Sequence, residues 1–282
     1  MRVHPECYPC FFEQILKTVQ IVQADRDAVL EVMRRFSQHL AGFREEATPA
    51  EVGREAYRLI TEITGVTDPY ARIKKICTQK ALALLPRLEE WIAASPDRLH
   101  AAVQVAIAGN VIDFGITEDF DLDEDLKSLL TQELAVDHFP EFRERLESAE
   151  QVVYVADNAG EAVFDRPLIQ EMGKPVIYVV REKPVINDAV RQDAVEAGIH
   201  EVAEILSSGT DAPGTIPRQS SEAFLKAYHS ADLIISKGQG NYEGLSGTKR
   251  PVFFLLKAKC EPVAQSLGVR KGDLVLKMAG DA

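Results

Sequence analysis

Three polar clusters in the second half of the chain contain residue types suited to catalysis. Each cluster lies at or shortly after the end of a short apolar segment, and the clusters are Asp157–Glu161, Arg181–Asp188 and Lys237–Glu243. Carboxylate and amide oxygens are the ligands that hard divalent cations such as Mg²⁺ and Mn²⁺ prefer, and no nearby set of His and Cys favours zinc. We therefore expect a divalent ion to be bound by Asp157, Asn158 and Asp188.

Such a metal site would suit the hydrolysis of a phosphate ester. Three protein ligands leave coordination positions for water and a substrate phosphate. Lys237 and the backbone N–H groups of a glycine-rich loop at 238–241, which contains Gly238 and Gly240, could hold phosphate oxygens. An ion that polarises the phosphoryl group and activates water is a hydrolase arrangement. In this scheme Asp157 is a ligand rather than a nucleophile, because a carboxylate already bonded to an ion is less nucleophilic.

Each cluster also has a purely structural interpretation. Asp and Asn are frequent N-caps, so Asp157–Asn158 could simply cap the helix that follows, and Asn187–Asp188 could do the same. Glycine-rich segments such as residues 237–244 are mostly turns. The catalytic interpretation therefore depends on the three clusters meeting at one end of the predicted sheet.

The elements that must bring these clusters together are short, continuous apolar strands. Helical periodicity separates most of them, and continuous rather than alternating apolar residues indicate burial on both faces. These features predict a parallel sheet covered by helices, with the carboxyl ends of the strands along one edge, where ligands bind. The predicted strands span 152–156, 175–180, 201–206, 232–236 and 251–256.

The first hundred residues show a different pattern, which predicts helices. Apolar residues recur at helical spacing over 12–22 and 29–40. Thr48–Glu51 combines an N-cap, a proline at the first helical position and a capping-box glutamate, and Asp68–Pro69 and Ser95–Pro96 repeat the cap-and-proline pattern. We expect two domains, which are a helical bundle or cap over 1–100 and an α/β domain over 101–282, where 101–150 is a helical connection.

Composition limits the possible classes of function. The 282 residues carry a formal net charge of −12, which disfavours a broad nucleic-acid-binding face. No apolar stretch is long enough to span a bilayer, and the first residues contain no apolar signal segment. We therefore expect a cytoplasmic protein with no nucleic-acid or membrane partner, and the sequence does not indicate an oligomeric state.

The four cysteines are too few for a disulfide scaffold in a chain of this length. Cys7 and Cys10 form a CxxC pair, but no second CxxC or His pair follows at zinc-finger spacing. Structural zinc shared with Cys77 is one alternative, and buried thiols, or a pair that oxidises on handling, are the simpler interpretation. Cys260 lies near the expected site without a neighbouring His, so we interpret it as a pocket-wall residue.

Several short motifs occur in a fixed order along the chain. They are HPECYPC at the start, DPY at 68–70, GNVIDFG at 109–115, DNAGE at 157–161, KPVINDA at 183–189, SKGQGNYEGL at 236–245 and LLKAKCEPVAQSLGV at 255–269. Each motif alone is weak, but together they cover nearly the whole chain. In this order they resemble the metal-dependent damage-control phosphatases, long catalogued as domain of unknown function 89, and most of all the stand-alone prokaryotic branch of that family.

This resemblance implies a three-layer α/β/α sandwich with a mostly parallel sheet and an added N-terminal helical domain. It also implies a divalent cofactor, Mn²⁺, Ni²⁺, Co²⁺ or Mg²⁺, held by Asp157, Asn158 and Asp188. Lys237 is the implied phosphate partner. Family members hydrolyse phosphomonoesters, including sugar phosphates and damaged or surplus phosphometabolites, so the implied substrate is a small phosphorylated metabolite.

Further residues are expected around this site. Glu161 would either act on the attacking water or support the metal ligands, and we favour the supporting role. The helical cap and loops around 110–120 and 207–220 would determine selectivity. The resemblance implies that the pocket is completed by Asn110, Asn241 and Glu243.

Two other functions remain alternatives at the level of sequence. One is an S-adenosylmethionine-dependent carboxyl methyltransferase, an activity proposed within a related branch, because α/β sandwiches host both chemistries. DNAGE at 157–161 has a single glycine and begins with an acid, which disfavours close approach of a nucleotide. The other is a metal or phosphometabolite-binding module without turnover, which only an assay separates from a slow enzyme.

Overall fold

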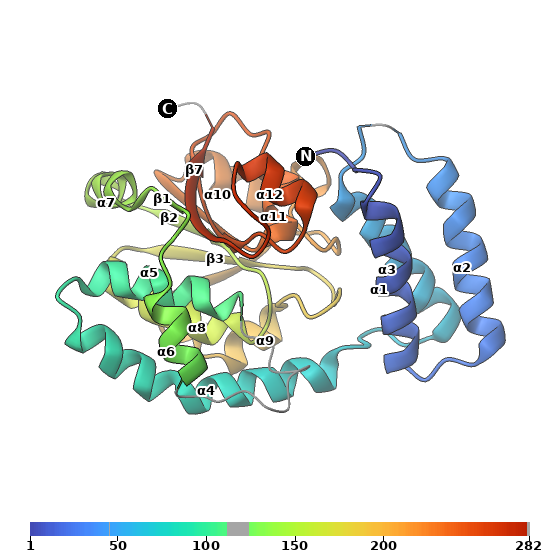
Figure 1. Ribbon diagram of the computed structural model, residues 1–282, viewed down its shortest axis with the longest axis horizontal. Coiled ribbons are helices and arrows are strands. Elements are labelled where there is room, and N and C mark those ends of the chain that lie inside the picture. Colours follow the sequence, from blue (N-terminus) through green and yellow to red (C-terminus); the bar gives the residue numbers. More distant parts are fainter. Residues whose placement is uncertain (45, 112–123, 281–282) are drawn as a thin grey trace.

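The central feature of the computed structural model, which describes residues 1–44, 46–111 and 124–280, is a seven-stranded sheet (Figure 1). The strand order is β1-β7-β6-β5-β2-β3-β4, and every pairing is parallel except that of β6 with β7. The strands are β1 (Val136–Asp137), β2 (Val152–Val155), β3 (Val176–Val180), β4 (Glu204–Ser207), β5 (Leu233–Lys237), β6 (Val252–Lys257) and β7 (Leu274–Ala279).

All five predicted strands are present, whereas β1 and β7 were not predicted. The second half of β7 is only partly buried, so its apolar run is too short to stand out in the sequence. The described α-helices are α1 (Cys7–Ile21), α2 (Arg26–Ala41), α3 (Pro49–Thr64), α4 (Ala71–Ala94), α5 (Arg98–Gly109), α6 (Glu124–Thr131), α7 (Phe139–Ser148), α8 (Glu161–Met172), α9 (Arg191–Glu196), α10 (Glu222–Ser230), α11 (Gln239–Leu245) and α12 (Glu261–Leu267).

Helices cover both faces of the sheet and complete a three-layer α/β/α sandwich, as expected (Figure 1). Side chains on successive strand residues point to opposite faces. Tyr154 and Phe253 therefore pack in the core shared with α4, α5 and α8, while Val153 and Phe254 pack in the core shared with α10, α11 and α12. Burial on both faces explains why these strands are continuously apolar.

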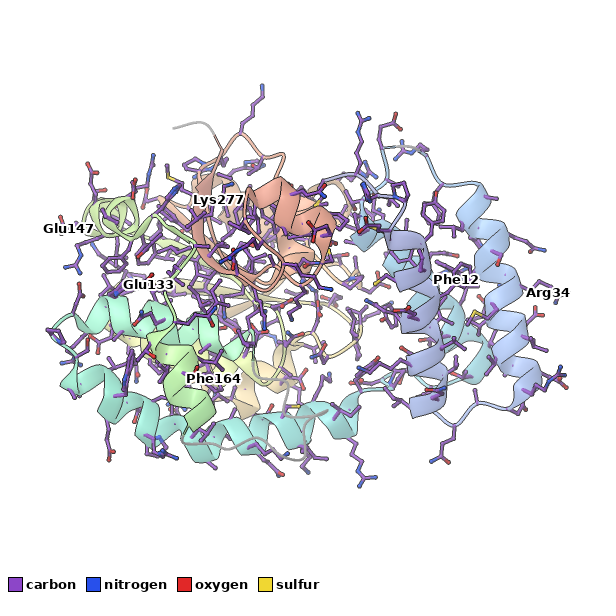
Figure 2. The ribbon with its side chains drawn as sticks, in the orientation of Figure 1. Phe12, Arg34, Glu133, Glu147, Phe164 and Lys277 are labelled. Carbon is purple, nitrogen blue, oxygen red and sulfur yellow. The ribbon has the colours of Figure 1, made fainter. Side chains whose placement is uncertain are left out.

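Helices α1, α2 and α3 form a separate helical layer beside the carboxyl edge of the sheet (Figure 1). Figure 2 shows Phe12 between α1 and α2, where its ring lies 5.4 Å from that of Phe36. The predicted capping box of α3 is present, because Thr48 Oγ1 accepts from the Glu51 N–H (3.3 Å) and Glu51 Oε2 accepts from the Thr48 N–H (2.8 Å).

The other two predicted caps are wrong by two residues. The N-cap of α4 is Tyr70 and that of α5 is Asp97. Asp68 Oδ1 accepts from the Tyr70 N–H (3.0 Å), and Ser95 Oγ accepts from the Asp97 N–H (3.3 Å). Both side chains therefore stabilise a turn that precedes a helix, which is the other local role of Asp and Ser.

Helix α4 packs with the sheet rather than with the helical layer, although it falls within the range 1–100 expected for the helical domain. Its apolar face, including Leu84 and Leu88, belongs to the core of α5 and α8. Over 101–150 the described elements are α5, α6, β1 and α7, in keeping with a largely helical connection. Of the loop expected at 110–120 to affect selectivity, residues 112–120 lie outside the described residues. No described helix has the length and apolarity needed to cross a membrane.

Candidate active site

The carboxyl ends of β2 and β3 bring together the three residues predicted to bind a metal. An antiparallel bridge pairs Asn158 with Asp188, and the Ala189 N–H donates to the Asp157 carbonyl oxygen (2.8 Å). The two loops are thus joined through their backbones. The side chains of Asp157, Asn158 and Asp188 line one cavity of about 350 Å³, between the sheet edge and the helical layer.

These residues do not cap the helices that follow, so the structural interpretation of both clusters is wrong. The N-cap of α8 is Gly160 and makes no side-chain capping bond. The N-cap of α9 is Val190, and its backbone N–H donates a hydrogen bond to Asp193 Oδ2 (2.9 Å). Neither Asp157–Asn158 nor Asn187–Asp188 is therefore explained by a capping role.

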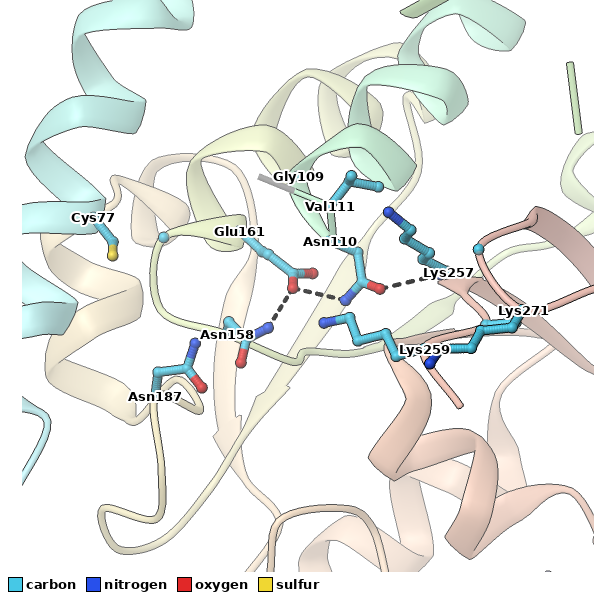
Figure 3. A pocket seen from close by; sticks show the side chains of 13 residues that line it. Cys77, Gly109, Asn110, Val111, Asn158, Glu161, Asn187, Lys257, Lys259 and Lys271 are labelled. Atoms are coloured by element: carbon cyan, nitrogen blue, oxygen red, sulfur yellow. Dashed lines mark hydrogen bonds between the residues drawn. The ribbon is translucent and has the colours of Figure 1, made fainter. Parts of the chain in front are cut away.

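Two amides bridge the carboxylates of Asp157 and Glu161, and Figure 3 shows both amides with Glu161. Asn110, at the end of α5, donates from Nδ2 to Asp157 Oδ2 (3.0 Å) and to Glu161 Oε1 (2.7 Å). Asn158 Nδ2 donates to the same two oxygens. Asn110 Oδ1 accepts from the Lys257 N–H (3.2 Å), which joins the end of α5 to the end of β6. The expected pocket residues Asn110 and Glu161 are thus part of this cluster.

Lys237 lies beneath the cavity and does not line it. Its side chain is fully buried, and Nζ donates to Asp165 Oδ1 (2.6 Å) and to Glu161 Oε2 (3.3 Å). Asp165, which the sequence analysis did not identify, also accepts from the hydroxyls of Tyr154 and Tyr178, both at 2.7 Å. The expectation of a direct phosphate contact is therefore at odds with this placement.

Arg181, which begins the second predicted cluster but was given no role there, holds the carboxylate of Asp188. Its Nε donates to Asp188 Oδ2 (2.7 Å), and its Nη2 donates to Asn241 Oδ1 (2.8 Å). Asn241 is itself fully buried and donates to the carbonyl oxygens of Ala156 (2.9 Å) and Lys237 (2.8 Å). Asn241 therefore ties strand ends together and does not line the pocket, contrary to expectation. The sequence contained one indication of this role, because Arg181 is a charged residue that directly follows the buried strand β3.

The predicted glycine-rich loop at 238–241 is the start of α11, so the loop prediction is wrong. The Gly238 N–H donates to the Leu255 carbonyl oxygen (3.1 Å) and is thus occupied. Gly238 has a φ of 78°, and a Cβ there would overlap the carboxylate of Asp157. Gly240 lines the cavity and lies so close to the backbone of Pro213 that a Cβ would not fit. Both glycines permit close approach of neighbouring atoms, and phosphate binding by the backbone N–H of Gly240 stays a prediction.

Glu243 lines the same cavity, on the side formed by α11. Its Oε1 accepts from Gln239 Nε2 (3.0 Å). Burial raises the pKa of Glu243 to about 7. This carboxyl group is therefore poised to change its protonation state near neutral pH, unlike an ordinary solvent-exposed glutamate.

The buried charges at the strand ends do not balance. Two buried cations, Arg181 and Lys237, lie among four buried carboxylates, whereas a third, Lys74, is paired with Asp68 and Asp193. Burial raises the pKa of Asp157 well above its usual range, and the charges of Glu161 and Asp188 raise it further. Burial also raises the pKa of Asp188, although Arg181 opposes this. The four carboxylates are Asp157, Glu161, Asp165 and Asp188.

A divalent cation fits this arrangement, because it would offset the excess negative charge and accept hard oxygen ligands. The expected donor set, Asp157, Asn158 and Asp188, contains two carboxylates and one amide. Among residues 1–44, 46–111 and 124–280, no group of three or more His, Cys, Asp or Glu has the placement of a metal site. Any ion held here therefore depends on the amide oxygen as well as the carboxylates.

A second, larger cavity of about 560 Å³ opens on the other side of Asn158 (Figure 3). Asn158, Glu161 and Cys77 line it, and Glu161 is the acid among them. Three lysines that the sequence analysis did not assign to the site face it from the ends of β6 and the turn before β7. These are Lys257, Lys259 and Lys271.

The whole chain is similar to known proteins. The family model described as damage-control phosphatase ARMT1-like domain matches residues 3–275. The damage-control phosphatase of Archaeoglobus fulgidus is 35% identical, over 99% of this chain and 99% of that protein. The damage-control phosphatase of Pyrococcus horikoshii is 34% identical, over 98% of this chain and 97% of that protein.

A solved structure shares the fold as well. The crystal structure of the domain-of-unknown-function-89 protein from Pyrococcus horikoshii covers 98% of both chains with a TM-score of 0.91 and 34% identity. The expected family resemblance is thus confirmed, and it supports a phosphatase role. This chain belongs to the damage-control phosphatase ARMT1-like family.

Proposed function

We propose that this protein is a metal-dependent phosphatase that hydrolyses small phosphomonoesters, such as sugar phosphates or damaged or surplus phosphometabolites. The observation that carries the proposal is the convergence of Asp157, Asn158 and Asp188 on one cavity wall, above an excess of buried negative charge. Family membership supports the same reaction class.

Asp157, Asn158 and Asp188 would hold the divalent ion, for which Mg²⁺, Mn²⁺, Co²⁺ and Ni²⁺ are the candidates. When bound, such an ion polarises a phosphoryl oxygen and lowers the pKa of water. The hydrogen bond from Arg181 Nε to Asp188 Oδ2 (2.7 Å) leaves the other carboxylate oxygen of Asp188 for the ion. Ligands held in this way lose little freedom on binding a metal.

Glu161 and Lys237 act in support of these ligands. Both oxygens of Glu161 already accept hydrogen bonds, Oε1 from Asn110 and Asn158, and Oε2 from Lys237. A carboxylate engaged on both oxygens orients its neighbours better than it accepts a proton from water. We therefore assign Glu161 the supporting role, and we replace direct phosphate binding by Lys237 with electrostatic support of Glu161.

The substrate phosphate would lie beside Asn158 and Lys259, which line both cavities, and its leaving group would occupy the cavity of about 560 Å³, a volume typical of small-ligand sites. Figure 3 shows the Lys259 side chain extending toward Asn110 and Glu161, and the charge of Lys259 offsets part of the rise that burial causes in the pKa of Asp157. Lys257 and Lys271 line the same space. Their ammonium groups would stabilise the charge that develops on phosphoryl oxygens.

Hydrolysis with and without metal tests this proposal. Protein treated with EDTA would be assayed against a panel of phosphomonoesters, with Mg²⁺, Mn²⁺, Co²⁺ or Ni²⁺ added back singly. We expect hydrolysis only with metal, and Asp157→Asn should reduce kcat/KM by more than about 100-fold. The matched control is Asp27→Asn, because Asp27 lies exposed on α2, away from the site.

Two results would contradict the proposal. One is full hydrolysis in the presence of EDTA. The other is an Asp157→Asn variant that retains wild-type kcat/KM while binding metal equally well by equilibrium dialysis. If no ester is hydrolysed but the metal binds and Asp157→Asn abolishes that binding, the binding-module alternative is correct.

A further inference from the structure

The cavity of about 350 Å³ contains three thiols that come from two parts of the fold. Cys7 and Cys10 belong to α1 in the helical layer, whereas Cys260 is the N-cap residue of α12 in the sheet domain. Cys260 is separated in sequence from Cys7 and Cys10 by 250 residues or more, and the fold brings all three to one space. Cys77, in contrast, lines the other cavity.

Each of the three sulfur atoms accepts a weak hydrogen bond from a neighbouring residue. Cys260 Sγ accepts from Gln239 Nε2 (3.4 Å). Cys10 Sγ accepts from Gln14 Nε2 (3.7 Å), and Cys7 Sγ accepts from a backbone N–H (3.4 Å). The first of these bonds links the thiol cluster to α11, whose residue Glu243 lines the same cavity.

The three thiols line one cavity, and each is at least partly exposed. Burial raises the pKa of all three thiols, and a thiolate at Cys260 would raise the pKa of Cys7 and Cys10 further. Cys7 and Cys260 are nevertheless only half-buried, and Cys10 is exposed. Small molecules in solvent can therefore reach the cluster. Cys77 lines the other cavity, which disfavours structural zinc shared between Cys77 and the Cys7–Cys10 pair.

We propose that Cys260 and the Cys7–Cys10 pair form a redox site, in which a disulfide links the helical layer to the sheet domain. A small-molecule disulfide supplies the oxidising equivalents. A thiolate of one protein cysteine attacks it, forms a mixed disulfide and displaces one small thiol. A second protein cysteine then attacks the protein sulfur of that mixed disulfide and displaces the second small thiol. Two protein thiols are oxidised, one small disulfide is reduced, and the two thiol protons leave on the products.

The link would affect the site described above, because Asp157, Asn158 and Asp188 line the same cavity. A bond between α1 and the start of α12 would hold the helical layer against the sheet edge and cross this space. The loss of activity on oxidation rests on the proposed function, whereas the disulfide itself does not.

Peptide mapping in glutathione redox buffers tests the disulfide. The full chain would be equilibrated at a series of ratios, alkylated and digested with trypsin without reduction. We expect a cross-linked species containing peptides 3–17 and 260–270, which carry the Cys7–Cys10 pair and Cys260. Cys260→Ser should abolish this species, and Cys77→Ser should retain it. A Cys7→Ser/Cys10→Ser double variant should also lack it, which guards against misfolding of the single variant.

Three outcomes would overturn the redox site. They are complete alkylation of all three thiols in the most oxidising buffer, a disulfide confined to peptide 3–17, and linkage of either peptide to Cys77. The expected functional result is that hydrolysis falls more than about 10-fold on oxidation and returns with dithiothreitol, while the activity of Cys260→Ser does not respond to the redox buffer. If the reduced protein hydrolyses no phosphomonoester, the proposed function fails, but the mapping result stands independently.

Discussion

The side chain of Lys237 is enclosed by the carboxylates it neutralises. Burial alone would lower the pKa of Lys237, but Asp165 and Glu161 outweigh this effect and raise it. The charged form is therefore favoured by its partners, even without contact with solvent. The ammonium group of Lys237 therefore stabilises the fold and also holds the carboxylate of Glu161 in place.

Replacing Lys237 should destabilise the protein. Lys237→Met leaves buried carboxylates without their cation, and we expect a loss of about 3–5 kcal/mol in the free energy of unfolding. Urea unfolding monitored by circular dichroism measures this, with Lys249→Met as the control at an exposed lysine. Adding Asp165→Asn should restore part of the loss. Wild-type stability combined with a raised KM would instead support direct phosphate binding.

Glu243 should make stability fall as pH rises toward neutrality. Its folded pKa of about 7 lies above the ordinary value, so between about pH 4.5 and 7 the native state retains a proton that the unfolded chain has released. Folding then opposes ionisation, and the cost reaches at most about 3 kcal/mol above pH 7. Glu243→Gln should remove this cost.

Thermal unfolding from pH 4 to pH 8 measures the effect. We expect Glu243→Gln to approach the wild type at acid pH and to become more stable than the wild type as pH passes about 7. Glu13→Gln, at an exposed position of α1, should follow the wild-type profile. Parallel profiles for wild type and Glu243→Gln would contradict the raised pKa.

At the scale of elements, the turn from β5 into α11 positions Asp157. Gly238 adopts a φ of 78° there, and a Cβ would overlap the Asp157 carboxylate. Gly173, after α8, has a φ of 60° but no atom within 4 Å of an added Cβ. The two glycines thus share backbone strain but differ in what surrounds them, which makes Gly173 a matched control.

Substitution at these two glycines should separate strain from displacement. Gly173→Ala and Gly238→Ala should each lose about 1 kcal/mol of stability from the positive φ. Only Gly238→Ala should also displace Asp157, and we expect its phosphatase activity to fall by about 10- to 100-fold. Equal activities for the two variants, measured at saturating metal, would show that Asp157 tolerates this change.

For the whole molecule, the buried excess of acid predicts that divalent cations stabilise the fold. A ligand that binds only the native state adds about 2.7 kcal/mol at 100 times its Kd, which corresponds to a rise of roughly 5 °C in Tm. Differential scanning fluorimetry with Mn²⁺, Ni²⁺ or EDTA measures this. The rise should be absent in Asp157→Asn, and an equal rise in that variant would place the binding elsewhere.

The local pattern of the sequence determined five of the seven described strands, the cap of α3 and the meeting of Asp157, Asn158 and Asp188. Continuous apolar runs identify doubly buried strands, and parallel strands necessarily end at one edge. Thr48 and Glu51 each accept a hydrogen bond from the backbone N–H of the other. They lie within four residues, so the cap of α3 needs no distant contact.

Only the tertiary structure decided which polar residues near that edge face a cavity and which face the core. Lys237 and Asn241 resemble pocket residues in the sequence, but the direction of each side chain depends on partners from other elements, Asp165 on α8 and Arg181 after β3. The same holds for Cys260, which reaches the space beside α1 through packing between the helical layer and the sheet. Long-range packing sets the direction of a side chain at the end of a strand. The pattern of residues along the sequence contains little information about that direction.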